Sequence, residues 1–273
     1  MQASSQWTEP KGTLGAIVNE AEVRVLGLES RRPELVRLAE AATRGPSLRE
    51  ALSGSHVAIL AEVKRRSPSK GLIAGDLGAV SQASAYARGG AAAVSILTEP
   101  AHFGGSIDDL TEVRAQLAIP VLKKDFHVQP IQLLEARALG ASAALLIARA
   151  LSPSRLSGMM RMAAQLELEV LVEVRDEEEL ARALGEGASM VGVNNRNLET
   201  LEIDPSTSER IIPLIPAGVV AIAESGIRSR SDVERYAACG ADAVLVGSSL
   251  STAEDAAAAT RALTLVPRRD RAR

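Results

Sequence analysis

The sequence predicts an α/β fold, a (β/α)8 (TIM) barrel with an N-terminal helical extension, on three observations. A glycine followed by small residues recurs after four helical stretches and opens an apolar strand each time, at 90–94, 140–144, 187–191 and 240–244. Glycine commonly ends helices in this way, and a repeat at fixed spacing indicates a repeated unit. The copies begin 50, 47 and 53 residues apart, which suits two strand–helix units per copy. Four more apolar runs lie between and before them, at 57–64, 119–124, 168–174 and 218–224, which makes eight strands.

Amphipathic segments separate these strands, for instance at 131–139, 155–166, 177–184 and 231–238. Strands that alternate with helices pair in parallel, and near-continuous apolar strands are buried on both faces. Eight such units match a barrel of the usual size, about 250 residues. A doubly wound open sheet is the alternative, but it would not need the fourfold repeat, and no Gly-x-Gly-x-x-Gly follows the first strand.

We expect a single domain over 1–273, with a helical extension at 12–55 and the barrel at 56–263. The extension reads as helices at 14–26, 32–42 and 47–52, and it is too small to sustain its own core. Residues 1–11 and the basic tail 264–273 are expected to be loose, the tail as a solvated end rather than a nucleic-acid arm.

The composition excludes several classes of protein. Lys plus Arg (31) nearly balances Asp plus Glu (34), and only 2% of residues are aromatic, which argues against nucleic-acid binding. The longest uncharged apolar run, 143–148, is too short to span a bilayer, and the N-terminus has no apolar signal core. A cytoplasmic enzyme is therefore expected. The single Cys239 and three dispersed histidines predict neither an internal disulfide nor a zinc cluster.

The first strand ends on two charges that share one face. Alternation along the strand places Glu62 and Lys64 side by side, while the intervening Val63 faces the other way. Burying both ions costs several kcal/mol of hydration, roughly, so such a pair usually marks a site. The alternative is a frayed strand end with a surface ion pair.

Most of the other strands also end on polar residues, and a barrel gathers the carboxyl ends of its strands at one mouth. These residues are Ser95, Thr98, Lys124, Asp125, Arg149, Glu173, Asn194, Arg196, Glu224, Ser225, Gly247, Ser248 and Ser249. Two lysines and up to three carboxylates without metal-ligand geometry indicate general acid and base catalysis on an organic substrate.

The last two strand ends predict a phosphate seat. Segments 224–227 and 246–249 are rich in Gly and Ser, and barrels often bind phosphate there through backbone N–H groups. A Cβ at these glycines would block close approach. Either turn alone is weak evidence, but together they indicate a phosphorylated substrate.

Two further patterns lie near the predicted mouth. Alternation sends Lys123 and Lys124 in opposite directions, so one of them points inward. Phe103 and Phe126, the only phenylalanines, both follow strand ends and suggest an apolar floor for an aromatic ring, although core packing is the default for each alone.

Together these motifs resemble the indole-3-glycerol phosphate synthase family. They run in the same order as in that family from about Leu14 to Leu263, and the matching segments are 59–69, 95–99, 103–106, 124–126, 171–174, 192–198, 223–227 and 247–250.

The resemblance implies a cofactor-free carboxy-lyase of tryptophan biosynthesis. It would convert 1-(2-carboxyphenylamino)-1-deoxyribulose 5-phosphate to indole-3-glycerol phosphate, with loss of CO2 and water. Lys124 resembles the general acid, Glu173 the general base of the dehydration, and Lys64 the residue that holds the substrate carboxylate. The other implied roles are positioning by Glu62 and Asn194, support by Ser225, phosphate contacts by Ser67, Gly226, Gly247 and Ser248, ring contacts by Phe103 and Phe126, and substrate binding by Arg196 and Glu224.

Two residues depart from the family pattern: Arg175 stands where many relatives carry His, and Lys123 could perturb Lys124 if both were partly buried. Another sugar-phosphate barrel, such as an aminosugar-phosphate isomerase, and a non-catalytic binding barrel remain alternatives. The oligomeric state stays open, with a monomer slightly favoured.

Overall fold

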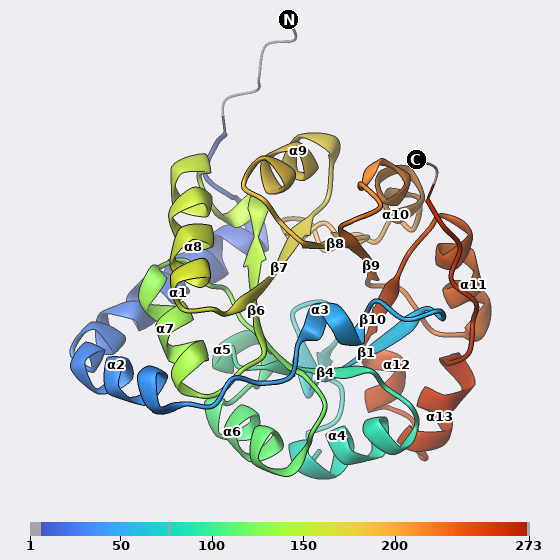
Figure 1. The fold of residues 1–273 in the computed structure, drawn as a ribbon, viewed down its shortest axis with the longest axis horizontal. Coiled ribbons are helices and arrows are strands. Elements are labelled where there is room, and N and C mark those ends of the chain that lie inside the picture. The colour runs from blue at the N-terminus through green and yellow to red at the C-terminus, as the bar shows by residue number, and fades with distance from the viewer. Residues whose placement is uncertain (1–6, 76, 272–273) are drawn as a thin grey trace, which may run out of the picture.

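Eight parallel strands close into a barrel in this computed structural model, which describes residues 7–75 and 77–271 (Figure 1). The strands are β1 (Ala58–Val63), β4 (Ala93–Leu97), β5 (Val121–Lys124), β6 (Ala143–Ile147), β7 (Glu169–Val174), β8 (Met190–Asn194), β9 (Val220–Glu224) and β10 (Ala243–Val246). Each strand pairs with its neighbour along the chain, and β1 closes the ring on β10. The predicted fold class is confirmed.

Helices surround the barrel, and most of them connect consecutive strands. They are α4 (Ala79–Arg88), α5 (Pro100–Phe103), α6 (Ile107–Gln116), α7 (Pro130–Ala138), α8 (Pro153–Gln165), α9 (Glu177–Gly185), α10 (Ser206–Ile211), α11 (Arg230–Ala238), α12 (Ser248–Ser251) and α13 (Ala256–Leu263). A short hairpin, β2 (Arg66–Ser67) with β3 (Gly71–Leu72), follows β1. Single turns of 3-10 helix occur at η1 (Ala148–Ala150) and η2 (Ile212–Leu214).

The four repeated glycines all adopt positive φ, at 96° for Gly90, 74° for Gly140, 80° for Gly187 and 89° for Gly240. This left-handed conformation ends a helix, and a Cβ disfavours it. The repeat that predicted the barrel therefore has a backbone cause.

The N-terminal extension covers the barrel in three places. It consists of α1 (Gly12–Glu29), α2 (Arg32–Ala41) and α3 (Leu48–Ala51). Helix α2 lies against α7, and α3 lies over the amino end of the barrel (Figure 1). Leu48 and Leu52 are fully buried there, and Glu169 at the start of β7 accepts the backbone N–H of Leu48. None of the described helices is both long and apolar enough to cross a membrane.

The two chain ends are packed where they are described, which corrects the expectation of loose ends at 1–11 and 264–273. Arg149 binds the carbonyl of Thr8, and Trp7 donates to the carbonyl of Arg149. In the tail, Pro267 bridges to His56 and the side chain of Arg271 is 4% exposed. A guanidinium can satisfy several buried carbonyls at once, which the sequence did not reveal. Residues 1–6 and 272–273 lie outside the described residues.

Replacing Arg271 with Ala should lower the free energy of unfolding by about 2–3 kcal/mol, because it leaves a buried carboxylate with one fewer cation. Arg271 Nη1 lies 2.7 Å from Asp242 Oδ2, and Arg271 also donates to the carbonyls of Ile215 and Val219. Urea unfolding checks this. Asp270→Asn is the control, since that side chain is 96% exposed and its loss should cost less than about 0.5 kcal/mol.

Candidate active site

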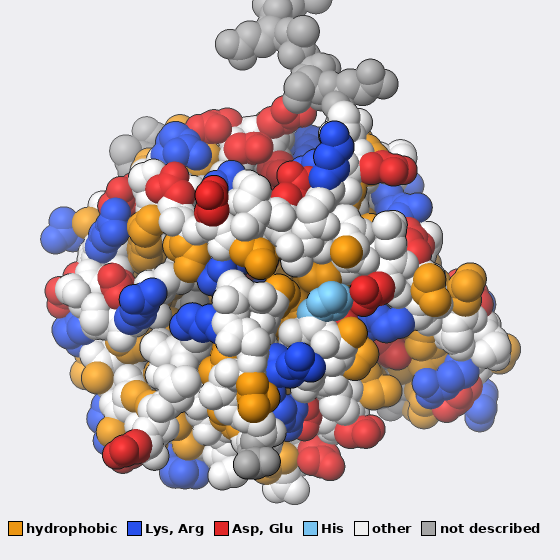
Figure 2. Space-filling model, turned by 180° about the vertical axis from the view of Figure 1, so that it is seen from behind, with side chains coloured by type: hydrophobic (Ala, Val, Ile, Leu, Met, Phe, Trp, Pro, Cys, Tyr) orange, Lys and Arg blue, Asp and Glu red, His pale blue; other side chains and the backbone are white. Residues whose placement is uncertain are grey.

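A cavity of about 520 Å³ opens at the carboxyl ends of the strands. Figure 2 shows this face of the molecule, opposite to the one viewed in Figure 1, and Lys and Arg side chains gather near its middle. Thirteen of the fourteen predicted site residues line the cavity: Glu62, Lys64, Ser67, Phe103, Lys124, Phe126, Glu173, Asn194, Arg196, Ser225, Gly226, Gly247 and Ser248. The fourteenth, Glu224, is 1% exposed and lies beneath them.

Three carboxylates surround the Lys124 ammonium. Its Nζ lies 3.6 Å from Glu173 Oε2, 3.6 Å from Glu224 Oε2 and 3.9 Å from Glu62 Oε2. The four residues come from β5, β7, β9 and β1, so only a closed barrel brings them together. Lys124 is the inward member of the lysine doublet.

Glu62 also pairs with Lys64, as alternation along β1 predicts. Lys64 Nζ lies 2.5 Å from Glu62 Oε1, and the two side chains are 18% and 1% exposed. The pair is thus not a frayed surface contact. A Cβ at Gly247 would lie 2.6 Å from Glu62 Oε1, so a larger residue there would displace this carboxylate.

The buried charges shift one another's pKa values. Burial would lower the pKa of Lys124, but Glu224, Glu173 and Glu62 together raise it above its ordinary value. Burial raises the pKa of Glu224 to about 8, against the opposing effect of Lys124 and with a further contribution from Glu173. At neutral pH Lys124 is therefore charged, and the Glu224 carboxyl is mostly protonated and able to donate a hydrogen bond.

The raised pKa of Glu224 predicts a pH-dependent stability. Between the unfolded pKa of about 4.5 and the folded pKa of about 8, the native carboxyl keeps a proton that the unfolded chain has lost. Raising the pH through this window therefore weakens folding, by up to about 1.4 kcal/mol per pH unit. Glu224→Gln removes this contribution, so the variant should gain stability relative to the parent from pH 5.5 to pH 8. Urea unfolding at several pH values measures the difference, with surface Glu234→Gln as control.

Asn194 holds the carboxylate of Glu173 in place. Its Nδ2 donates to Glu173 Oε1 at 2.8 Å, and its Oδ1 accepts the backbone N–H of Arg196 at 2.9 Å. Arg196 is half-buried, and its guanidinium donates to the carbonyl of Leu201. The second oxygen of Glu173 is left to face Lys124.

Phe103 and Phe126 form one apolar wall of the cavity, as predicted. Their ring centroids are 5.9 Å apart and tilted by 37°. Lys64 Nζ lies 6.0 Å from the Phe103 centroid. Leu14 and Ile17 of α1 complete this apolar part and were not predicted, because the sequence does not show that α1 crosses the mouth.

The other end of the cavity has the features of an anion seat. Ser225 and Gly226 adopt positive φ values of 67° and 87°, which turn the chain sharply after β9. Such strain in a non-glycine residue often marks a functional site. Asn195 fixes this turn by donating to the Ser225 carbonyl at 3.0 Å. Lys70 and Arg228 also line the cavity and were missed, since isolated loop cations carry no pattern.

Lys123 points away from the cavity. It is 1% exposed, and its Nζ lies 3.1 Å from Glu135 Oε2 on α7 and 3.3 Å from His127 Nε2. Burial and this lysine lower the pKa of His127 to about 3. Lys123 therefore has its own buried partners, Asp125, Glu135 and His127.

Sequence comparison identifies the family. The sequence model of indole-3-glycerol phosphate synthase matches residues 14–263. The chain belongs to the indole-3-glycerol phosphate synthase family. Two relatives carry that name: one from Parafrankia sp. is 48% identical over 84% of this chain and 87% of its own, and one from Micrococcus luteus is 44% identical over 88% and 95%.

A member of the indole-3-glycerol phosphate synthase family is a decarboxylating lyase of tryptophan biosynthesis that acts on a phosphorylated small molecule, and this chain is such an enzyme. Among solved structures, 3-hexulose-6-phosphate synthase from Salmonella typhimurium is similar with a TM-score of 0.60 at 15% identity, covering 76% of this chain and 96% of its own. Thiamine phosphate pyrophosphorylase from Pyrococcus furiosus has a TM-score of 0.57 at 17% identity, covering 80% and 96%. These two likenesses show the barrel fold alone.

Proposed function

We propose that this cavity closes the indole ring of 1-(2-carboxyphenylamino)-1-deoxyribulose 5-phosphate by general acid and base catalysis. The ring carbon that bears the carboxylate attacks the ketone carbon of the ribulose, and the ketone oxygen must gain a proton. Lys124 donates that proton. Its ammonium lies within 3.9 Å of the carboxyl groups of Glu62, Glu173 and Glu224, at the mouth of the barrel.

The next two steps release CO2 and water. Breaking the bond to the carboxylate returns its electrons to the ring, so the aromatic system is restored. The new hydroxyl then leaves as water while the carbon beside the nitrogen loses a proton. Glu173 takes that proton, supported by the hydrogen bond from Asn194 that orients its carboxylate. Lys64 contributes a proton to the departing hydroxyl.

Substrate binding divides between the two ends of the cavity. Phe103 and Phe126 contact the aromatic ring, while Lys64 and Arg196 hold its carboxylate. Glu62 positions both lysines, and the buried Glu224 carboxyl supports Lys124 from beneath the cavity.

The phosphate occupies the opposite end, among Ser67, Ser225, Gly226, Gly247 and Ser248. Its binding energy orients the reacting carbons, which lie far from it. We also propose that the enzyme works in the cytoplasm and that it is a monomer. Sedimentation at micromolar concentration tests the oligomeric state.

The observation that carries the proposal is the Lys124 ammonium surrounded by Glu62, Glu173 and Glu224 beside the two phenylalanine rings. Incubating the purified protein with the substrate should produce indole fluorescence and one equivalent of CO2. An aminosugar-phosphate isomerase would convert its own substrate instead. A protein that binds the substrate yet forms no product on long incubation would be a binding barrel.

A further inference from the structure

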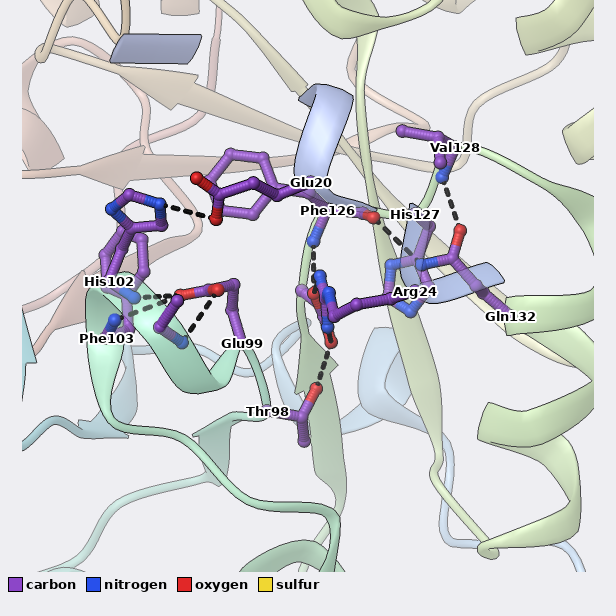
Figure 3. A network of polar contacts seen from close by, with 12 residues as sticks. Glu20, Arg24, Thr98, Glu99, His102, Phe103, Phe126, His127, Val128 and Gln132 are labelled. Atoms are coloured by element: carbon purple, nitrogen blue, oxygen red, sulfur yellow. Dashed lines mark hydrogen bonds and ion pairs between the residues drawn. The ribbon is translucent and has the colours of Figure 1, made fainter. Parts of the chain in front are cut away.

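Helix α1 contacts both loops that carry the phenylalanine rings. Glu20 and Arg24 are four residues apart, so they share one face of α1. Arg24 donates to both oxygens of Asp125, at 2.8 and 3.3 Å, one residue before Phe126. Glu20 Oε2 lies 2.9 Å from His102 Nε2, one residue before Phe103. In Figure 3 a dashed line joins Glu20 to His102, and Arg24 lies beside Phe126.

Asp125 is the centre of the stronger contact. Its side chain is 3% exposed and accepts hydrogen bonds from the Thr98 hydroxyl at 2.7 Å and from the Phe126 backbone N–H at 2.8 Å. Lys123 Nζ lies 3.6 Å away. A carboxylate with this many donors allows the attached peptide little freedom, and that peptide carries the Phe126 ring.

Asp125 stays ionised in this environment. Burial alone would raise its pKa, but Lys123 and Arg24 hold the pKa of the carboxyl well below its ordinary value. The carboxylate therefore remains an acceptor for Arg24 at neutral pH. Arg24 is the member of the network that belongs to the N-terminal extension, 101 residues away in the chain.

The second contact is weaker because Glu20 is half exposed. The loop that carries His102 and Phe103 is already fixed by hydrogen bonds on its buried side. Buried Glu99 accepts the backbone N–H groups of Ala101, His102 and Phe103 at the start of α5 (Figure 3). Since those contacts occupy both oxygens of Glu99, we assign the Glu20–His102 pair a supporting role rather than a cation site.

We propose that Arg24 is a positioning residue, which acts through Asp125 to set the Phe126 ring against Phe103 and so fixes the slot for the aromatic half of the substrate. This inference rests on the proposed role of the two rings in binding that half. The contact between Glu20 and His102 supports the Phe103 side of the same slot.

The test separates the two halves of the substrate with two probes, anthranilate for the aromatic end and inorganic phosphate for the other. Arg24→Gln should weaken anthranilate binding and raise KM by about tenfold, while kcat stays within about a factor of three. Phosphate inhibition should be unchanged. Arg24→Lys, which keeps the charge without the two-pronged donor, should give an intermediate effect, and Glu20→Gln only about a twofold one.

Glu29→Gln is the matched control, because Glu29 lies at the end of the same helix and pairs with Arg32 of α2 at the exposed surface. Its anthranilate affinity should equal that of the parent. Unchanged anthranilate binding in both Arg24 variants, an equal loss in Glu29→Gln, or an equal loss of phosphate binding would each overturn the inference. A parent protein that turns over substrate but binds no anthranilate would overturn the role of the slot itself.

Discussion

Lys124→Ala should lower kcat by about 10²- to 10⁴-fold, the usual contribution of a general acid. No other ammonium is recorded within ion-pair distance of Glu173 or Glu224 in the part of the chain that the structure describes, so a neighbouring lysine does not replace it. Both products should disappear together, because the ring cannot close without a proton on the ketone oxygen. Stopped assays for CO2 and for indole fluorescence measure this.

Anthranilate and phosphate binding provide the control for Lys124→Ala. The phenylalanine slot and the phosphate end do not depend on this side chain, so both affinities should stay near those of the parent. Indole formation at more than a tenth of the parent rate would contradict the assignment of Lys124 as the acid.

Glu173→Gln should separate the two products. The substitution keeps the shape of the side chain but removes the base that accepts a proton as water leaves, so indole formation should fall by about 10²- to 10⁴-fold. Ring closure and loss of CO2 precede that step and use Lys124. A single turnover should therefore release CO2 faster than indole fluorescence appears, and a non-fluorescent intermediate should accumulate.

Asn194→Ala is the companion variant for Glu173. It leaves the carboxylate in place but removes the hydrogen bond that orients it. We expect CO2 again to appear before indole, but the rate of indole formation should fall less, by about tenfold. If CO2 and indole formation slow equally in Glu173→Gln, the residue acts before decarboxylation and the assigned step is wrong.

The sequence predicted the barrel and most of the cavity because strand ends in this fold converge regardless of loop detail. Glu62 and Glu173 lie on strands and Lys64 directly follows β1, so the alternation along those strands shows which side chains share a face and predicted their convergence. The lysine doublet was ambiguous. Its outcome depends on the register of β5, where Lys124 pairs with Leu97 of β4, and no local pattern encodes that register.

Contacts between elements that are distant in the chain could not be predicted from the sequence. The path of α1 across the mouth brings Leu14 to the cavity and Arg24 to Asp125, and neither residue type signals its partner. The tail was misjudged for the same physical reason. A basic, polar end usually stays in water, but the Arg271 side chain donates to Asp242 and to four backbone carbonyls.

The seam between β1 and β10 has a consequence for how the chain is made. Ala58 on the first strand pairs with Ala243 on the last strand, so this pairing forms only after β10 has been synthesised. The backbone N–H of Arg268 donates to the Ser55 carbonyl beside this joint. Contacts this remote in the chain form slowly. The barrel can therefore close only after residues as far as β10 have been synthesised, and deleting the residues from Arg268 onward would remove the hydrogen bond beside this joint.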